Sequence, residues 1–451
     1  MLRLMTVAVL TGLLALIPAA KAEVTVNISE GVLKPTPLAI PTFEVSGGAD
    51  SQLAAEITEV VQNDLISTGL FTITPESAHI QRDLSIDTQP RFADWKIIQT
   101  DALVVGEVDT VTVEGVEFIR ASVRLWDVYG EEVMRLEGQA GRRFTAKPED
   151  WRRIAHKIAD TIYSRLTGED PYFDTRIVYI AETGPKDARK TRLAIMDSDG
   201  ANVKYLTTDN NLVLSPRFSP SNQQITYMSY ENQEPRVYLF DIQNGRQEVL
   251  GDIKTFAPRF SRDGESVLMT KANNGNSDIY IRDLVTQEMR RLTDNPNIDV
   301  SPSMSPDGRQ VVFTSDRGGS PQLYIMNVDG SPLTCPSGGR DTVCRITFGS
   351  GAYSAPVWSP RGDLIAFTKQ LRGKFHIGVI GTDGEGERLL TESYLDEGPA
   401  WSPNGRVIIF AREPYAGGPR KLWSVDLTGR NLRQVPTPTE ASDPAWSPLL
   451  N

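Results

Sequence analysis

Hydrophobic and polar residues follow one pattern in the first third of the chain and a different one after it. Residues 51–68 place apolar side chains at helical spacing. Ser51 is the expected N-cap of that helix, and Gly69 follows its end. A second amphipathic helix is expected to run from Pro148 to Gly168. The segment 91–99 predicts a third, shorter helix.

Strand-like stretches lie between these helices. They are bounded by tight turns that carry glycine, as strands in small sheets often are. The stretches are VTVNI, LAIPTFEV, ALVVGEVDTV, EFIRASVRLWDV and EVMRLEGQAGR. The alternation predicts a small α/β sandwich in which helices cover one face of a sheet. The segment GEDPYFD at 168–174 marks the expected end of this region.

A repeat fills the rest of the chain. Its sign is a proline in an apolar strand, followed two positions later by a large apolar residue and then, in most copies, by Ser-Pro. Successive prolines are separated by 42, 44, 54, 43 and 45 residues. A fixed period of this length is typical of repeat architectures. The repeated prolines are Pro216, Pro258, Pro302, Pro356, Pro399 and Pro444.

Each unit contains four strand-like runs, which describes one blade of a β-propeller. Proline suits the innermost strand because one edge of that strand faces the channel and needs no N–H. Asp-Gly and Asn-Gly pairs such as Asp307-Gly308 predict type I′ hairpin turns. The large residues after the prolines are expected to pack between blades and not to form a ligand cage. They are Phe218, Phe260, Met304, Trp358, Trp401 and Trp446.

The chain ends with DPAWSPLLN, which repeats only the first strand of a unit. Residues 176–207 carry the second, third and fourth strands of a unit but not the first. The C-terminal segment Asp443–Pro448 therefore supplies the missing strand and pairs with RIVYIAE near residue 176. The predicted fold is mainly β: a six-bladed propeller closed by a C-terminal strand and preceded by a small α/β domain.

The first 22 residues have the composition of a secretory signal. Arg3 precedes an apolar run, and Ala20-Lys21-Ala22 resembles a cleavage site, with Ala22 and Glu23 on its two sides. The alternative is an uncleaved anchor, although the run is short for a membrane span of about 20 residues. We expect a cleaved signal peptide over residues 1–22, an α/β domain over 23–168 and a propeller over 169–451. The mature chain is then expected to be exported, and no later apolar stretch is long enough to span a membrane.

Charge and cysteine content narrow the function classes. The net charge is −11, and removing residues 1–22, which hold two cations and no acid, makes it −13. Nucleic-acid binding is disfavoured because it usually needs a basic surface. Cys335 and Cys344 lie close together within the single long repeat interval, and in an exported protein they are expected to form a disulfide. A zinc site would need more ligands than this pair.

No residue pattern indicates catalysis. The histidines His79, His156 and His376 are dispersed, and each is expected to be structural or superficial, with His156 near the polar side of its helix. No G-x-S-x-G nucleophile motif occurs, and the Ser-Pro-Asp-Gly turns lack the spacing of sialidase turns. The turn Asp197–Gly200 (DSDG) suggests calcium only weakly, since an EF-hand needs ligands across twelve residues. We predict no enzyme, no cofactor and no metal.

The loops that precede the innermost strands converge on one mouth of the channel. They combine exposed aromatic or aliphatic residues with Asp and Asn, which is typical of a protein interface. The expected anchors are Leu212, Phe256, Tyr353 and Tyr394. Ordinary turn composition is the alternative.

Signal peptide, domain order, six proline units and the terminal PAWSP together resemble the TolB family of the bacterial Tol–Pal envelope system, over nearly the whole chain. The resemblance implies a monomeric, non-enzymatic protein of the periplasm that binds the lipoprotein Pal at the propeller mouth. It also implies that the mature N-terminal segment contacts the inner-membrane protein TolA. The system serves outer-membrane integrity and invagination during cell division.

Carried over residue by residue, the resemblance predicts two contact sets. The Pal face comprises Leu212, Lys254, Thr255, Phe256, Ala257, Asp299, Val300, Ser301, Tyr353, Asp396 and Glu397. The TolA segment runs from Glu23 to about Pro37 and includes Glu23, Val24, Ile28, Gly31, Val32 and Pro37. It departs from the family pattern at LKPT, residues 33–36. The alternatives to this function are a periplasmic propeller lyase or hydrolase and a glycan-binding module.

Overall fold

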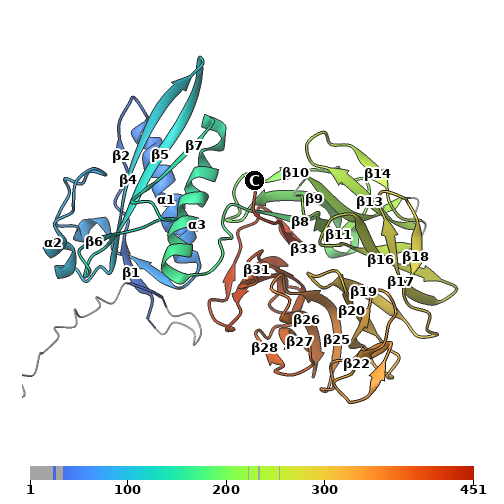
Figure 1. Cartoon of the computed structure of the whole chain (residues 1–451). Coiled ribbons are helices and arrows are strands. Elements are labelled where there is room, and N and C mark those ends of the chain that lie inside the picture. Colours follow the sequence, from blue (N-terminus) through green and yellow to red (C-terminus); the bar gives the residue numbers. More distant parts are fainter. Residues whose placement is uncertain (1–23, 27–33, 222, 232–233, 253, 451) are drawn as a thin grey trace, which may run out of the picture.

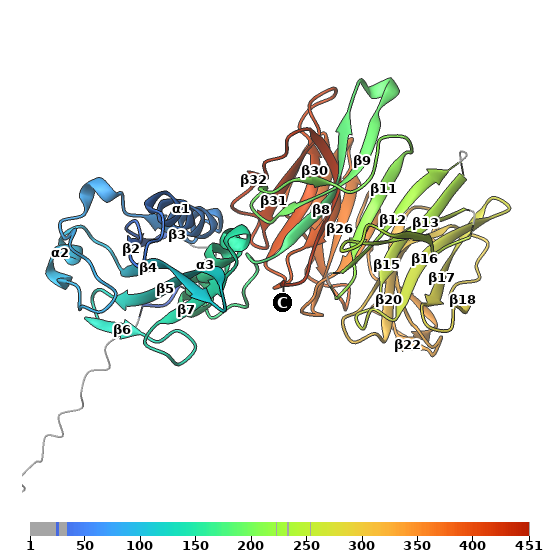
Figure 2. The same ribbon diagram turned by 90° about the horizontal axis from the view of Figure 1, so that it is seen from above.

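The chain folds into an N-terminal α/β region beside a β-propeller (Figure 1). The computed structural model describes residues 24–26, 34–221, 223–231, 234–252 and 254–450. Figure 2 shows the two parts from above, joined by a short connection after α3. Within the described residues, no helix is long and apolar enough to cross a bilayer. The predicted signal peptide, residues 1–22, lies outside the described residues.

The N-terminal sheet is mixed, with strand order β3-β1-β4-β5-β6, while β2 pairs with β4 and β7 with β5. The long hairpin β4–β5 is its centre. Of the predicted strand VTVNI, residues 24–26 are described and are not in a strand, so that prediction is wrong for them. The strands are β1 Thr36–Ala39, β2 Glu44–Val45, β3 Phe71–Ile73, β4 Ala102–Val113, β5 Val116–Asp127, β6 Glu132–Met134 and β7 Arg142–Ala146.

Two long helices, α1 (Ser51–Ser67) and α3 (Trp151–Thr167), pack on one face of this sheet. The N-cap of α1 is Asp50, whose side chain accepts the Gln52 N–H at 2.9 Å, so the predicted cap Ser51 is one residue too late. The sequence expectation that helices cover one face is also incomplete. The short helix α2 (Phe92–Ile97) buries Trp95 against the opposite face.

The propeller consists of six four-stranded sheets, which confirms the predicted fold class. In chain order, the first two blades are β8 Arg176–Thr183, β9 Lys190–Asp197, β10 Lys204–Tyr205 and the C-terminal β33 Glu440–Trp446; then β11 Val213–Phe218, β12 Gln224–Glu231, β13 Glu234–Asp241 and β14 Gln247–Val249. The third and fourth are β15 Thr255–Phe260, β16 Ser266–Asn273, β17 Asn276–Asp283 and β18 Met289–Arg291; then β19 Asp299–Met304, β20 Gln310–Ser315, β21 Gln322–Asn327 and β24 Val343–Arg345. The fifth and sixth are β25 Ala352–Trp358, β26 Leu364–Leu371, β27 Lys374–Gly381 and β28 Arg388–Leu389; then β29 Leu395–Trp401, β30 Val407–Glu413, β31 Lys421–Asp426 and β32 Arg433–Gln434.

The two ends of the propeller sequence meet in the first blade. Strand β33 pairs antiparallel with β8, with Ala441 opposite Ala181 and Trp446 opposite Ile177. This confirms the predicted closure, and the strand begins three residues earlier than the repeat alone indicated. Closure removes the open sheet edge that an unfinished ring would expose.

The hairpin turns differ from the predicted type I′ geometry. At Asp307-Gly308 only the glycine has a positive φ, +73°. The Gly308 N–H donates to the Ser305 carbonyl at 3.0 Å, and Asp307 Oδ1 accepts the Arg309 N–H at 3.1 Å. This is a type I turn followed by a left-handed glycine. The aspartate accepts local hydrogen bonds and does not adopt a left-handed conformation itself.

The large residues after the prolines fill the space between neighbouring blades, as predicted. Trp358, for example, packs with Val312 and Leu323 of the fourth blade and with Ile365 of its own blade. In the long repeat interval, Cys335 and Cys344 form a disulfide. It lies next to a small extra hairpin beside the fourth blade, formed by β22 (Leu333–Thr334), directly before Cys335, and β23 (Arg340–Asp341).

A buried carboxylate anchors the connection between the two parts of the chain. Asp160 of α3 accepts the backbone N–H groups of Tyr172, Phe173 and Asp174 at 2.9, 2.7 and 3.0 Å. Asp160 is 7% exposed, and Tyr172 and Phe173 belong to the core beneath α3. Burial raises the pKa of Asp160 to about 7, although these three N–H groups oppose the shift.

Candidate partner-binding face of the propeller

Each innermost strand contains the same backbone irregularity. The residue before the repeated proline has a left-handed φ between +48° and +66° in all six blades, and the register with the second strand shifts at this point. These residues are Ser215, Ala257, Ser301, Ala355, Gly398 and Asp443. Sequence reasoning missed this ring of bulges. The available signal was that none of the six residues is β-branched or bulky, since such residues rarely adopt the left-handed conformation.

The innermost strands line the channel, and the channel has two ends. We call the end where the innermost strands begin the front mouth and the end where they finish the rear mouth. The turns at the rear contact the connection to the N-terminal region: Arg361 pairs with Glu169, and Asn404 Nδ2 donates to the Asp170 carbonyl at 2.8 Å. The front mouth, which contains the predicted Pal face, therefore lies at the opposite end from this connection.

The rear mouth holds a cavity of about 260 Å³ lined by residues of all six blades. The residues that follow the repeated prolines form its wall, including Phe260, Trp358 and Trp401. Arg217 and Arg259 also line it, from two adjacent blades. The pKa of both guanidinium groups is lowered, chiefly because the groups are buried; the negative charge of Asp443 opposes this shift but does not reverse it.

Several predicted Pal-face residues are exposed or half-buried at the front mouth. Leu212 is 42% exposed, and Lys254 is exposed with a left-handed φ of +68°. Phe256 and Ala257 are half-buried, and so are Val300, Ser301 and Glu397. Burial raises the pKa of Glu397, while Arg420, 3.3 Å away, lowers it. These side chains are available to a partner at this end of the channel.

Four other predicted face residues are buried. Asp299 and Asp396 are both fully buried and bind Arg317 and Arg412 through two hydrogen bonds each, at 2.7–2.8 Å. The expectation that Tyr353 is exposed is wrong. The ring is fully buried, its hydroxyl donates to Glu387 at 2.8 Å and Lys369 lies over its face. Thr255, also fully buried, accepts the Val237 N–H at 3.3 Å.

Two exposed apolar residues at the front mouth were not predicted. Ile298, directly before β19, is 43% exposed, and Phe348, in the loop before β25, is 55% exposed. With Leu212 and Tyr394, which is 44% exposed, they place one exposed apolar side chain in each of four leading loops. Exposed apolar groups within a polar rim are typical of interaction surfaces. The sequence shows apolar residues in these loops, but it does not indicate which of them are exposed.

The predicted TolA segment falls partly outside the described residues: Glu23, Ile28, Gly31 and Val32 are not described. Val24 N–H donates to Asp127 at 3.2 Å, and Val26 N–H donates to the Leu166 carbonyl at 2.9 Å. Val26 is 7% exposed and belongs to the core beneath α1 and α3. Pro37 lies in β1, opposite Thr72 of β3. The described part of the segment thus packs on its own N-terminal region.

All three histidines are buried. His79 and His376 each bond to a backbone carbonyl, at 3.2 and 2.8 Å. His156 is 2% exposed, and its Nδ1 lies 2.7 Å from Asp64 Oδ2 on α1. The expectation that His156 lies near the polar side of its helix is wrong, because α3 packs against both α1 and the propeller.

Comparisons with known proteins agree over nearly the whole chain. A family model for the TolB amino-terminal domain matches residues 24–134, and one for the TolB β-propeller domain matches residues 163–450. The Tol-Pal system protein TolB of Gluconobacter oxydans (strain 621H) is 45% identical over 435 residues, which cover 95% of this chain and 89% of that protein. The protein of the same name from Dinoroseobacter shibae is 50% identical over 430 residues, covering 94% and 93%.

A solved structure supports the same assignment. The crystal structure of TolB from Acinetobacter baumannii matches with a TM-score of 0.78 and 28% identity, covering 92% of this chain and 97% of that one. The resemblance inferred from the repeat and the domain order is confirmed by both the family models and the relatives. With its α/β region, its six-bladed propeller and its terminal strand closure, the chain belongs to the TolB family of Tol-Pal system proteins.

Proposed function

We propose that this protein is a non-enzymatic periplasmic scaffold that binds the lipoprotein Pal at the front mouth and TolA through its N-terminal segment. In this role it supports outer-membrane integrity and invagination during cell division. Membership of the TolB family supports the system-level role. Export by the predicted signal peptide would place the mature chain in the periplasm. The proposed scaffold is a monomer.

The observation that carries the Pal assignment is the set of exposed apolar residues in the leading loops. Leu212, Ile298, Phe348 and Tyr394 come from four blades and lie at one end of the channel. Lys254 and Glu397 add charge of both signs to the same mouth. Apolar anchors surrounded by polar groups are the usual composition of a protein-binding surface. A protein partner suits this surface better than a small substrate does.

The buried residues of the predicted face have a different role in this proposal. Asp299 and Asp396 hold the leading loops in place through their arginine partners and need not contact Pal themselves. The residues proposed to contact Pal are therefore only the exposed and half-buried members of the predicted face, together with Ile298 and Phe348. The relatives' names favour this scaffold over a propeller enzyme or a glycan-binding module.

Binding of a soluble Pal domain, measured by isothermal titration calorimetry, tests the front mouth. The triple variant Leu212→Ser, Ile298→Ser and Tyr394→Ala should weaken binding at least about 100-fold, because each truncated anchor typically costs 1–2 kcal/mol or more. The matched control is Val285→Ser. Val285 is 78% exposed in the turn between β17 and β18, at the rear end of its blade. Unchanged affinity in the triple variant would contradict the assignment.

The TolA proposal rests on the N-terminal segment. Two contacts, from Val24 to Asp127 and from Val26 to Leu166, support a segment that exchanges between its own domain and a partner. We further propose that Pal docking at the front mouth shifts this balance. Deleting residues 23–33 should abolish binding of the TolA domain and leave Pal binding measurable. Retained TolA binding would exclude the segment as its contact.

A further inference from the structure

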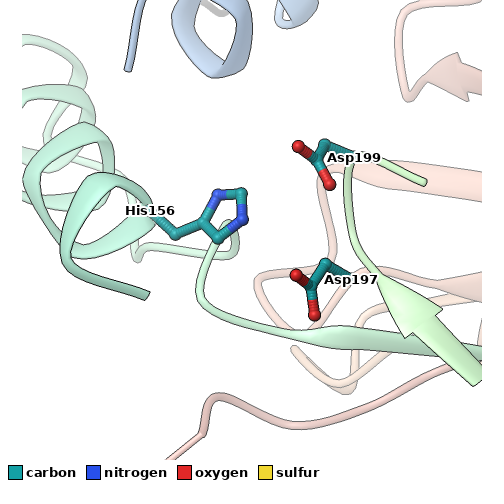
Figure 3. A group of neighbouring side chains, drawn as sticks. All are labelled: His156, Asp197 and Asp199. Carbon is teal, nitrogen blue, oxygen red and sulfur yellow. The ribbon is translucent and has the colours of Figure 1, made fainter. Parts of the chain in front are cut away.

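The joint between α3 and the first blade contains a cluster that the Tol–Pal function does not use. His156 of α3 faces two aspartates there: Asp197, the last residue of β9, and Asp199, in the turn that follows (Figure 3). One ligand atom from each of the three lies within 4.8 Å of the other two. A nitrogen and two carboxylates at this separation match the reach of a single metal ion.

The histidine is oriented for this purpose. Its Nδ1 lies 2.7 Å from Asp64 Oδ2, and both side chains are nearly fully buried. With Nδ1 donating to the carboxylate, a neutral ring carries its lone pair on Nε2. Figure 3 shows the ring directed at the two aspartates. Nε2 is buried and has no hydrogen-bond partner among the described residues. A carboxylate behind a histidine is the usual support of a metal-binding imidazole.

The aspartates are also held in place. Asp197 Oδ2 accepts the side-chain amide of Asn202 at 2.7 Å, and Asp199 Oδ1 accepts the Ala201 N–H at 3.0 Å. Arg152 contacts Asp199 and lies 3.6 Å from Asp197. Three carboxylates lie against one guanidinium and one imidazole, so the cluster keeps a surplus of negative charge in either protonation state of the ring. A divalent cation would balance that surplus, which is costly to leave in a mostly buried site.

We propose that His156 Nε2 and the carboxylates of Asp197 and Asp199 bind one divalent transition-metal ion of the Zn²⁺ class, with Asp64 as the positioning residue of His156. One imidazole and two carboxylates suit Zn²⁺, with water as a fourth ligand. Calcium fits less well because it takes six to eight oxygen ligands. The ion would join α3 to the first blade and stabilise the joint between the two parts of the chain. This proposal is independent of Pal and TolA binding.

Another blade supplies a matched control. The turn after β21 in the fourth blade, Asn327–Gly330, occupies the same place in the repeat as Asp197–Gly200. Asp329 there accepts the Ser331 N–H at 2.9 Å, just as Asp199 accepts that of Ala201. Asp329 lies on an exposed turn and belongs to no such cluster among the described residues. Asp329→Asn therefore changes the same turn position without touching the proposed site.

The test uses the untagged, chelator-treated full chain, titrated with ZnCl₂ by calorimetry. We expect one equivalent of Zn²⁺ to bind. Asp199→Asn should lower the affinity at least about 10-fold, and Asp64→Asn should lower it by about 10–100-fold, the usual effect of losing a ligand's support. Asp329→Asn should bind like the wild type. His156→Gln should abolish binding.

Because His156 is buried, its variant could fail to fold, so a measurement on the wild type accompanies it. The ¹⁵N spectrum of the imidazole rings should show the His156 Nε2 resonance shift on addition of one equivalent of Zn²⁺. Absence of stoichiometric binding, or wild-type affinity in Asp199→Asn, would overturn the proposal. A His156 Nε2 that stays protonated in excess Zn²⁺ would also overturn the proposal, since a protonated nitrogen has no lone pair to bind a metal ion.

Discussion

The indole Nε1 of Trp446 donates a 2.8 Å hydrogen bond to the hydroxyl of Thr175, 271 residues earlier in the chain. Trp446 ends the last strand, and Thr175 directly precedes the first strand of the propeller. Its indole also lies edge-on to Tyr172 with the ring centroids 5.9 Å apart. The contact between Trp446 and Thr175 links the β8–β33 closure of the propeller to the connection with the N-terminal region. We therefore expect a change at this contact to destabilise the closure and the connection together.

Deleting residues 443–451 removes the second half of β33, including the residues Ala445 and Trp446 that pair with Val178 and Ile177 of β8. We expect the whole propeller to lose cooperative unfolding, because the first blade would expose an unpaired strand edge and its packing with the sixth blade would be lost. Thermal unfolding followed by circular dichroism would measure this. A finding that only a local, low-amplitude change occurs would show that β33 is an appendage of an already stable ring.

A milder change isolates the contact at the seam. Trp446→Phe keeps most of the apolar surface and removes the N–H donor, so it should cost about 1–2 kcal/mol in free energy of unfolding. Thr175→Val removes the acceptor. In a double-mutant cycle the two changes should cost clearly less together than the sum of the single variants. Full additivity would mean that the hydrogen bond contributes nothing.

The buried and exposed residues of the front mouth should respond differently to substitution. Asp299→Ala leaves Arg317 without its buried partner and should destabilise the protein by about 3–5 kcal/mol. Ile298→Ser, at the neighbouring exposed position, should change stability by less than about 1 kcal/mol and weaken Pal binding instead. Urea unfolding and calorimetry on the same two variants separate these effects. The reverse pattern would make Asp299 a contact residue.

The ring of left-handed residues before the prolines predicts an unusual tolerance. Gly398 is the only glycine among the six, and a Cβ there would lie 3.7 Å from the nearest atom, Asp443 Oδ1. Gly398→Ala should therefore cost only the penalty of a left-handed alanine, about 1–2 kcal/mol. Gly106→Ala is the contrasting variant, since its Cβ would lie 2.5 Å from the ring of Phe43. It should cost several times more. Equal losses in chemical unfolding would contradict this explanation.

Asp160 predicts a pH dependence of stability. Its folded pKa, about 7, lies above the ordinary value of 3.8, so the unfolded chain releases this proton first. The stability that the neutral form contributes is present below about pH 4 and is lost as the pH rises towards 7. The free energy of unfolding of the wild type relative to Asp160→Asn should therefore fall by about 2 kcal/mol from pH 5 to pH 8. Urea titrations of both proteins at several pH values measure the difference, and a constant offset would show that Asp160 is ionised throughout.

The fold could be predicted from the sequence because the repeat is regular. Six prolines at one period, a unit without its first strand and a final strand without its unit leave a single arrangement, and the structure has it. The predicted type I′ turn was wrong because Asp307 stabilises a type I turn through its side chain. The Asp-Gly pair occurs in both turn types, so the two residues alone do not distinguish them.

The candidate surface was less predictable because polarity does not reveal burial. Asp299 and Asp396 belong to segments whose sequence predicts exposure, yet both are buried against an arginine. Arg412 lies on the neighbouring strand β30, and Arg317 lies two residues after β20. The cluster of His156, Asp197 and Asp199 was also beyond the sequence. Its histidine and its turn belong to different parts of the chain, and only the packing of α3 against the first blade brings them together.

The seam between β8 and β33 also sets a sequence of events during biogenesis. The α/β region can complete its sheet and helices once Thr167 has emerged, since these contacts are local to it. The propeller cannot, because the partner of its first strand is the last strand to be synthesised. Until β33 is available, the first blade therefore keeps an open strand edge at β8. A chaperone that covers strand edges would act in that interval, and the protein would become resistant to proteolysis in a single late step.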